Sequence, residues 1–169
     1  DMLFYTGMRS GELLALTPAD ILPDKRISIN KNYAKVKGEE LILIPKTAKS
    51  NRSIAIPDFL YDDIFDYISK LGGIGKDDRI FYFTKSALEK EIKRVAEKTG
   101  LPDIRVHDLR HSHASMLIDM GFDILEISER LGHESAKTTL DTYSHLYPEK
   151  DTKLAGALNR LRRPDEENA

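Results

Sequence analysis

The spacing of apolar side chains predicts mostly helix, with a small sheet in the first third of the chain. Apolar residues recur every three to four positions, the helical period, in four segments that each end close to a glycine. These segments are residues 59–68, 88–95, 109–120 and 124–131. Two shorter helices are expected on either side of Gly7, and residues 136–143 and 154–161 follow as the last two. The domain is therefore built mainly from helices.

Three short apolar segments predict the sheet. Residues 27–29 and 54–56 alternate isoleucine with small or polar residues, and residues 41–44 form a continuous apolar run. Segments of this length between lysine-rich turns are typical of strands in an antiparallel sheet. We therefore expect a three-stranded antiparallel sheet, and the fold class is α+β, mainly α.

Two of the helices begin with a recognisable capping pattern. Ser86 is followed three residues later by Glu89, and Asp123 is followed by Glu126. In such a capping box, each side chain accepts a hydrogen bond from a backbone N–H group that the first helical turn leaves free. We expect both pairs to cap their helices.

The composition is that of a single soluble domain. The chain has 169 residues, 40% apolar and 32% charged, which is enough to bury a core without a metal or a cross-link. The absence of cysteine excludes disulfides, Cys-ligated zinc and iron–sulfur clusters. Its apolar runs are far shorter than the roughly 20 residues of a membrane span. Because it begins with Asp1 and lacks a signal peptide, we expect a cytoplasmic fragment that another segment precedes, with residues 162–169 as a polar tail.

The charge is almost balanced overall but is unevenly distributed. The net charge is −2, yet residues 25–52 hold eight basic and two acidic residues, whereas residues 105–145 hold four basic and seven acidic ones. A positive hairpin on a neutral domain can contact a phosphate backbone. A solvated, lysine-rich surface hairpin gives the same pattern, so charge alone leaves both interpretations open.

The segment RVHDLRHSHASMLIDMG has the most chemical content. His107 and Arg110 lie three apart at a helix N-terminus, where backbone N–H groups and the helix dipole favour an anion such as phosphate. A capping or surface pair is the ordinary alternative. His111 stands four residues after His107, and His113 follows, which also allows two imidazole ligands of a metal. No carboxylate offers an obvious third ligand, so we expect neither a metal nor another cofactor.

Other segments supply candidates that are weak individually. Arg9 precedes a helix that carries Glu12 in its first turn, and Lys46 ends a strand of the basic hairpin. His133 directly follows a helix-ending glycine, and Tyr143 lies ten residues later. A surface ion pair, a solvated lysine, a helix-end histidine and a partly buried aromatic ring are the respective ordinary alternatives.

Taken together, these residues resemble the tyrosine recombinase (phage integrase) family, in its C-terminal catalytic domain. The matching blocks are TGMRSGELLAL, PKTAKSNRSIAIP and HDLRHSHASMLIDMGFDILEISERLGHESAKTTLDTYSH, in the order and spacing of the family. The resemblance spans about residues 3–145. It implies a recombinase that breaks and rejoins double-stranded DNA through a 3′-phosphotyrosyl intermediate, for integration and excision of a mobile element.

The resemblance also assigns roles to individual residues. It implies six catalytic residues, namely Arg9, Lys46, His107, Arg110, His133 and Tyr143. Glu12 occupies the acidic position that supports the site. In the basic hairpin, the residues expected to bind DNA are Lys35, Lys37, Lys49 and Arg52.

Elementary chemistry agrees with these roles. A phenol has a pKa near 10, so attack by Tyr143 at neutral pH needs a proton acceptor, for which His107 is the candidate. Arg9 and Arg110 can stabilise the charge of the transition state, and His133 would add a hydrogen bond. The leaving 5′-oxygen needs an acid, for which the candidates are Lys46 and its neighbour Lys49.

Two other functions share parts of this pattern. Type IB topoisomerases use the same chemistry to relax DNA, and a domain that has lost catalysis could remain as a DNA-binding or assembly module. The LGH and TTLDTYSH segments favour a recombinase. The family further implies a separate N-terminal DNA-binding domain outside this chain, a homotetramer on DNA and a mostly monomeric isolated domain. The helix at residues 154–161 is expected to dock on a neighbouring subunit or to fold back on its own.

Overall fold

The computed structural model describes residues 1–45, 48–146, 155–156 and 158–160. The helices are α1 (Met2–Thr6), α2 (Ser10–Ala15), α3 (Asp58–Lys70), α4 (Lys85–Thr99), α5 (Asp108–Asp119), α6 (Ile124–Leu131) and α7 (Ala136–Tyr143). The strands are β1 (Ile21–Leu22), β2 (Arg26–Ile29), β3 (Asn32–Val36), β4 (Glu39–Leu43) and β5 (Arg52–Ala55). Three single 3₁₀ turns connect them, η1 (Pro18–Asp20), η2 (Ala48–Ser50) and η3 (Ser144–Leu146). The mainly helical α+β fold is as predicted.

The three-stranded sheet is present, but one of its strands is not the one predicted. Its order is β1-β2-β5, all antiparallel, and Ile27 of β2 pairs with Ile54 of β5. The run at residues 41–44 instead lies mainly in β4, which among the described strands pairs only with β3, in a separate two-stranded hairpin. The third strand of the sheet is β1, which was not predicted.

The β3–β4 hairpin forms because its turn suits the twist of the strands. Lys37 and Gly38 form a two-residue turn, and both have positive φ angles, 51° and 92°. Two such residues define the type I′ turn, which favours a tight hairpin and tolerates glycine well. All five residues of β4 are exposed, so its apolar run does not pack in the core as a sheet strand would. Strand β3 packs on α2 through the buried Tyr33, whereas Lys35 and Lys37 near the turn are exposed.

Most predicted helix boundaries are confirmed. Gly7, Gly100 and Gly132 each end a helix in the left-handed conformation, and Asp123 forms the expected capping box with Glu126. The prediction for Ser86 and Glu89 is wrong, because α4 begins earlier. The side chain of Thr84 accepts a hydrogen bond from the Ala87 backbone and caps the helix there. Ser86 therefore already lies in the first turn.

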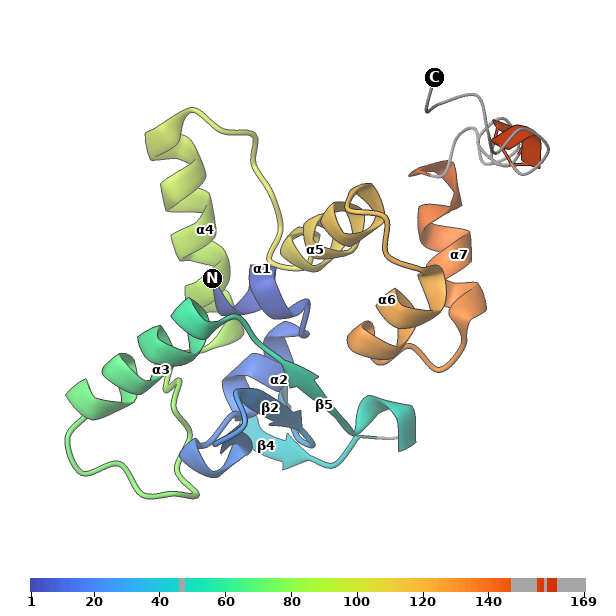
Figure 1. Ribbon diagram of the computed structural model, residues 1–169. Helices are drawn as coiled ribbons and strands as arrows, with labels where there is room; N and C mark the ends of the chain where they lie inside the picture. Colours follow the sequence, from blue (N-terminus) through green and yellow to red (C-terminus); the bar gives the residue numbers. More distant parts are fainter. Residues whose placement is uncertain (46–47, 147–154, 157, 161–169) are drawn as a thin grey trace.

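Helix α5 joins the two larger hydrophobic cores of the described residues. One core lies among α1, α2, the three-stranded sheet and α3, and the other among α5, α6 and α7. A third, smaller cluster packs Tyr33 of β3 on Leu14 and Ala15 of α2. Figure 1 shows α5 in the centre, with α1 below it and the α6–α7 pair to its right. Helix α5 packs on α1 and on α6. None of the helices in the described part of the chain is long and apolar enough to cross a membrane.

The predicted C-terminal helix falls largely outside the described residues. Leu154 and Leu161, two residues of its apolar stripe, lie there, as does the tail at residues 162–169. Leu158 lies in the short helical stretch at residues 158–160 and is exposed.

Candidate active site

Arg110 is the centre of the candidate site, because its buried guanidinium joins the segments that precede Arg9 and His133. One terminal nitrogen donates to the Gly7 carbonyl at 2.6 Å, and the other donates to the Leu131 carbonyl at 2.8 Å. Gly7 lies two residues before Arg9, and Leu131 lies two residues before His133. Burial, followed by the charge of Arg9, lowers the pKa of Arg110 to about 9, so this group stays cationic at neutral pH.

The turn between α1 and α2 requires glycine at position 7. Gly7 has a φ of 65°, and a Cβ atom there would lie 2.5 Å from the ring of His113. Only glycine adopts this conformation without cost and leaves space for the ring. The Gly7 carbonyl in this turn accepts a hydrogen bond from Arg110, and Arg9 follows at the start of α2.

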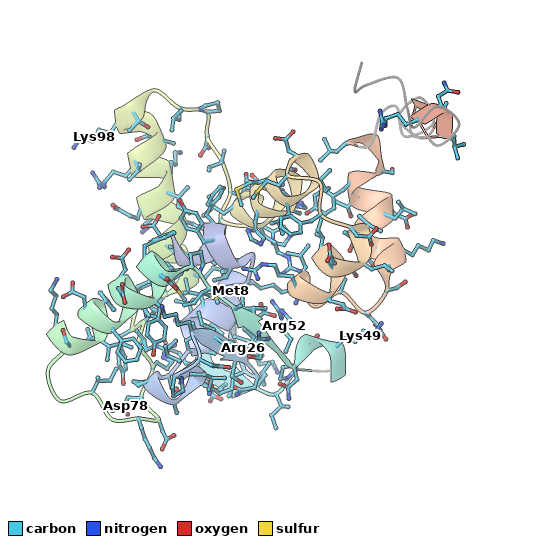
Figure 2. All side chains as sticks on the ribbon, viewed as in Figure 1. Met8, Arg26, Lys49, Arg52, Asp78 and Lys98 are labelled. Carbon is cyan, nitrogen blue, oxygen red and sulfur yellow. The ribbon has the colours of Figure 1, made fainter. Side chains whose placement is uncertain are left out.

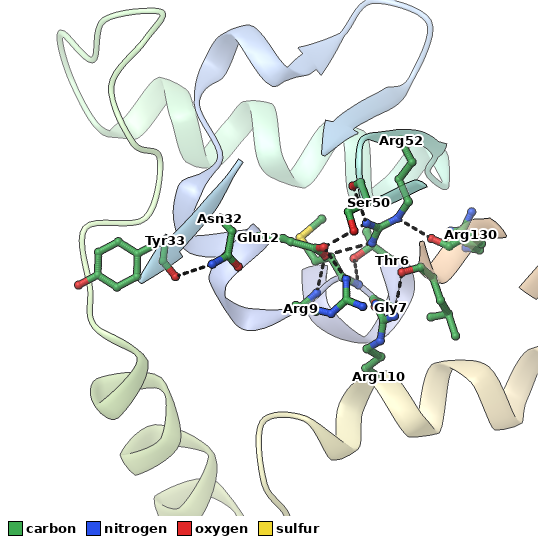
Figure 3. Close-up of polar contacts among 12 residues, drawn as sticks. Thr6, Gly7, Arg9, Glu12, Asn32, Tyr33, Ser50, Arg52, Arg110 and Arg130 are labelled. Carbon is green, nitrogen blue, oxygen red and sulfur yellow. Dashed lines mark hydrogen bonds and ion pairs between the residues drawn. The ribbon is translucent and has the colours of Figure 1, made fainter. Parts of the chain in front are cut away.

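Glu12 holds two arginines at the bottom of the site (Figure 3). Its carboxylate accepts from the backbone N–H of Arg9 at 2.7 Å and from the Arg9 guanidinium at 3.0 Å. Both terminal nitrogens of Arg52 also donate to it, at 3.1 and 3.0 Å. Burial alone would raise the pKa of Glu12, but the hydrogen bonds and charges of Arg52 and Arg9 outweigh this effect and lower it.

Arg52 has a different environment from the predicted one. Its side chain is only 7% exposed, and its Nε donates to the carbonyl of Arg130 in α6. Its hydrogen bonds to Glu12 and Arg130 tie β5 to α2 and α6. The DNA contact expected of Arg52 stays a prediction.

His133 lies in the loop between α6 and α7, and a residue of α7 orients its ring. Its Nδ1 lies 2.7 Å from the hydroxyl of Thr139, which is fully buried in α7. Burial, followed by the charges of Arg110 and Arg9, lowers the pKa of His133 to about 4, so the ring is neutral at pH 7. When Nδ1 accepts from the Thr139 hydroxyl, Nε2 carries the proton and can donate to an anion.

His107 lies on the solvent side of the site, at the start of α5. It is exposed and lines an open pocket of about 670 Å³, together with Arg9, which directly precedes α2, and Lys35 of the β3–β4 hairpin. Partial burial and the neighbouring charges of His111, Arg110 and Arg9 lower its pKa. The pocket is therefore lined by side chains from the starts of α2 and α5 and from the hairpin.

Tyr143 is the last residue of α7 and points into the protein. Its side chain is 4% exposed and packs in the α5–α7 core. Its hydroxyl lies 2.8 Å from Nδ1 of His111. Burial raises the pKa of Tyr143, and the charge of Arg110 partly offsets this effect. The ring is thus buried in the core, and the reactive role of its hydroxyl stays a prediction.

The lysines of the basic segment are distributed over two places. Lys46 lies outside the described residues, so its predicted role stays a prediction. Lys35 and Lys37 are exposed on the hairpin. Lys49, in η2, donates to the carbonyl of Glu134, beside the loop between α6 and α7. Figure 2 shows Lys49 at the edge of the domain and Arg52 inside it.

The histidines considered as metal ligands have other partners. His111 contacts Tyr143, and Nε2 of His113 accepts from Nε of Arg130 at 3.1 Å. Burial, followed by the charge of Arg130, lowers the pKa of His113 to about 4. Among the described residues, no three histidine, aspartate or glutamate side chains are grouped as metal ligands would be.

Two contacts of the site escaped the sequence analysis. The i,i+4 spacing of His107 and His111 was noted, but only as a metal pattern, and nothing in the sequence linked His111 to Tyr143, 32 residues later. Likewise, Arg52 was interpreted from its basic neighbours, and its partner Glu12 lies 40 residues earlier. Both pairs form because the fold brings segments that are distant in sequence within hydrogen-bond distance, α5 with the end of α7 and the start of β5 with α2.

Comparison with known proteins places this chain in a family. The defining sequence pattern of the Phage integrase family matches residues 1–150. The ICEBs1 integrase of Bacillus subtilis is 36% identical over 94% of this chain and 47% of its own length. This chain spans about half the length of the curated relatives it matches.

Solved structures show the same fold. The Tn1549 transposon integrase in complex with circular intermediate DNA superimposes with a TM-score of 0.82 at 22% identity, over 95% of this chain and 57% of that one. The catalytic domain of bacteriophage HP1 integrase superimposes with a TM-score of 0.62 at 25% identity, over 98% and 82%. With the matched sequence pattern, these likenesses lead to one conclusion: the chain belongs to the phage integrase family.

Proposed function

We propose that residues 1–169 form the catalytic domain of a site-specific DNA recombinase that cleaves and rejoins strands through a covalent link to Tyr143. The observation that carries the proposal is the position of Arg110. This one buried cation fixes the segments of Arg9 and His133, and its charge acts on the Tyr143 phenol. Two arginines, a neutral histidine and a phenol in one site suit attack on a phosphodiester.

In the proposed reaction, the phenol oxygen of Tyr143 bonds to phosphorus, and the bond from phosphorus to the 5′-oxygen breaks. Arg9 and Arg110 bind the non-bridging oxygens, whose charge grows in the transition state. His133 donates a hydrogen bond to the same group. Glu12 keeps the Arg9 guanidinium oriented by its two contacts with that residue.

Lys46 completes the reaction as the proposed acid. The 5′-oxygen leaves as a poorly stabilised alkoxide unless it receives a proton, and a lysine on a hairpin loop can supply one. The 3′-phosphotyrosyl link keeps the energy of the phosphodiester, so the 5′-hydroxyl of another strand can reverse the step. These residues need neither ATP nor a metal ion for this sequence of steps.

The relatives favour recombination over topoisomerase activity. Those compared above are integrases of an integrative element, a transposon and a bacteriophage, and one is described in complex with circular intermediate DNA. We propose double-stranded DNA as the partner, Lys35, Lys37 and Lys49 as backbone contacts, and action in the bacterial cytoplasm. A homotetramer on DNA, a separate DNA-binding domain and a monomeric free domain belong to the same proposal.

Covalent trapping tests this function. The protein is incubated with nicked duplexes of randomised sequence, in which the short cleaved strand diffuses away, and protein-linked strands are recovered after denaturation. The wild type should yield linked DNA, and Tyr143→Phe should yield none while its thermal unfolding stays cooperative. Tyr147→Phe, four residues later, is the control and should link normally. Linkage that persists in Tyr143→Phe, or is lost in Tyr147→Phe, would contradict the assignment.

A further inference from the structure

The hydroxyl of Tyr143 has one specific partner in the described part of the chain, the imidazole of His111. The two atoms, Oη and Nδ1, are 2.8 Å apart, which is the distance of a direct hydrogen bond. The ring centroids are 5.8 Å apart and tilted by 58°, so the contact is through the polar edge and not by stacking. His111 therefore contacts the oxygen that attacks phosphorus in the proposed reaction.

Burial makes this contact important for proton transfer. With 4% of its side chain exposed, Tyr143 has little access to water that could take its proton. Burial also raises the pKa of the phenol, so deprotonation by hydroxide is disfavoured at neutral pH. A base already in contact with the hydroxyl removes this difficulty.

His107 is less well placed for the same task. It is exposed on the pocket side of α5, and its contact in this region is with the His111 ring, edge to face, at 4.8 Å between centroids. Its position beside Arg9 in the pocket wall suits binding of phosphate oxygens. One helical turn separates the two histidines, so α5 can bind phosphate with the first and contact the nucleophile with the second.

The contact fixes which nitrogen faces the phenol, since Nδ1 is the ring atom 2.8 Å from Oη. The proton-acceptor role uses the tautomer in which the phenol O–H donates to Nδ1 and Nε2 carries the ring proton. The other groups near this ring are Asp108 on its own helix, which is paired with Arg105, and the edge of His107. These neighbours leave Nδ1 directed at Tyr143.

We propose that His111 is a further catalytic residue, the immediate proton acceptor of the nucleophile. As the Tyr143 oxygen bonds to phosphorus, its O–H bond breaks and the proton moves to Nδ1 of His111, while the leaving 5′-oxygen takes a proton from Lys46. In rejoining, the attacking 5′-hydroxyl returns its proton to Lys46, and His111 returns its proton to the departing phenol. No proton or charge is left over after one cleavage and one rejoining. This inference rests on the proposed function.

Three variants test the proton transfer in the trapping assay. His111→Asn keeps an acceptor oxygen close to the position of Nδ1, but asparagine does not take up a proton at neutral pH. His111→Ala removes the hydrogen-bond acceptor as well as the proton acceptor. Both variants should slow covalent linkage by about 100-fold to 10,000-fold, the usual contribution of a general base, while DNA binding is unchanged. Ser112→Ala, the exposed neighbour, should link at the wild-type rate.

Replacing Tyr143 by 3,5-difluorotyrosine gives a readout that a purely structural role would not change. This phenol ionises near neutral pH and needs no base, so it should restore most of the rate in His111→Asn and alter the wild type little. Wild-type rates in His111→Asn, or slow linkage that difluorotyrosine does not restore, would overturn the proton-acceptor role and leave the proposed function intact. No linkage by the wild type would instead contradict the proposed function itself.

Discussion

Glu12 shows how a buried carboxylate can organise a cationic site. Taking a carboxylate out of water is costly, and the cost is offset only when partners satisfy both oxygens. Arg9 and Arg52 do so with four hydrogen bonds, two from each residue. The arrangement keeps Arg9 at the pocket while Arg52 remains inside the fold.

Removing this carboxylate should destabilise the domain strongly. Glu12→Ala leaves the Arg52 guanidinium buried without its counter-ion, and we expect a loss of about 3–5 kcal/mol in urea unfolding. Asp66→Ala is the matched control, since Asp66 pairs with Lys70 on the exposed face of α3 and should cost less than about 1 kcal/mol. Equal losses in the two variants would show that the Glu12 cluster is not a buried network.

The same carboxylate predicts a pH dependence of stability. The folded state lowers the pKa of Glu12 below its usual 4.5, so the unfolded chain binds the proton more readily. Its contribution is fully present above pH 4.5 and is lost as the pH falls through the lower pKa of the folded state. Glu12→Gln should therefore flatten the acid side of the stability curve, measured by thermal unfolding between pH 3 and 6. An unchanged acid limb would contradict the lowered pKa.

Lys46 has a chemical test of its own. A substrate with sulfur at the bridging 5′ position has a leaving group that needs no acid. Lys46→Ala should be slow on ordinary DNA and largely restored on the sulfur substrate, whereas Lys49→Ala should resemble the wild type on both. If sulfur rescues Lys49→Ala and not Lys46→Ala, the role of acid belongs to Lys49.

Individual side chains were predictable only where the motif itself contained the information. The His-x-x-Arg spacing and the tyrosine segment predicted His107, Arg110 and Tyr143 as candidates without a structure, and their catalytic roles stay predictions. The environment of Arg52 was not predictable. A basic segment whose residues are all exposed and one that contains a single buried arginine have the same sequence pattern. Burial is decided by which distant element packs against the residue.

At the scale of elements, the β3–β4 hairpin is the clearest candidate for contact with a nucleic acid backbone. Its turn end is exposed, and Lys35 also lines the pocket that contains Arg9 and His107. Because Lys35 and Lys37 lie outside the buried cluster that Tyr33 forms with α2, substitutions of these lysines should leave the core unchanged.

Neutralising the hairpin should weaken DNA binding in a salt-dependent manner. Lys35→Ala and Lys37→Asn should each lower the slope of log K against log salt concentration by about 1, measured by fluorescence anisotropy. Asparagine is chosen at position 37 because it tolerates the positive φ angle there. Lys98→Ala, at the far end of α4, should leave the slope unchanged. Equal slopes for all four proteins would remove the hairpin from the interface.

Helices were easier to predict than strand pairing, and the reason is local. A helix is specified by neighbours three and four residues away and by its caps, so Gly7, Asp123 and Gly132 were sufficient to place boundaries. Strand β2 pairs with β5, although the whole β3–β4 hairpin lies between them in sequence, so no local pattern specifies this pairing. The Lys37-Gly38 turn is a weaker hairpin signal than Asn-Gly, because lysine seldom adopts a positive φ angle.

At the scale of the whole molecule, the C-terminal segment is expected to connect subunits. Deleting residues 150–169 from the full-length gene product should spare covalent linkage at a single site but impair synapsis and complete recombination. Sedimentation and strand-exchange assays provide the measurement. Unchanged recombination would remove the subunit-docking role, and collapse of the soluble fold would show that the helix packs on its own domain.

The charge of the whole site also predicts independence from metal ions. Because Arg9 and Arg110 supply the positive charge, cleavage should persist in excess chelator. The metal content of the purified protein should be far below one ion per chain. Stoichiometric zinc together with chelator-sensitive activity would contradict the roles given to His107 and His111.

The position and polarity of the covalent link test the central claim most directly. After trapping, the DNA-linked protein is digested with protease and nuclease, and the modified peptide is sequenced by mass spectrometry. The account predicts a single nucleotide joined through its 3′-phosphate to Tyr143. A link through a 5′-phosphate, or a link to any other residue, would contradict it.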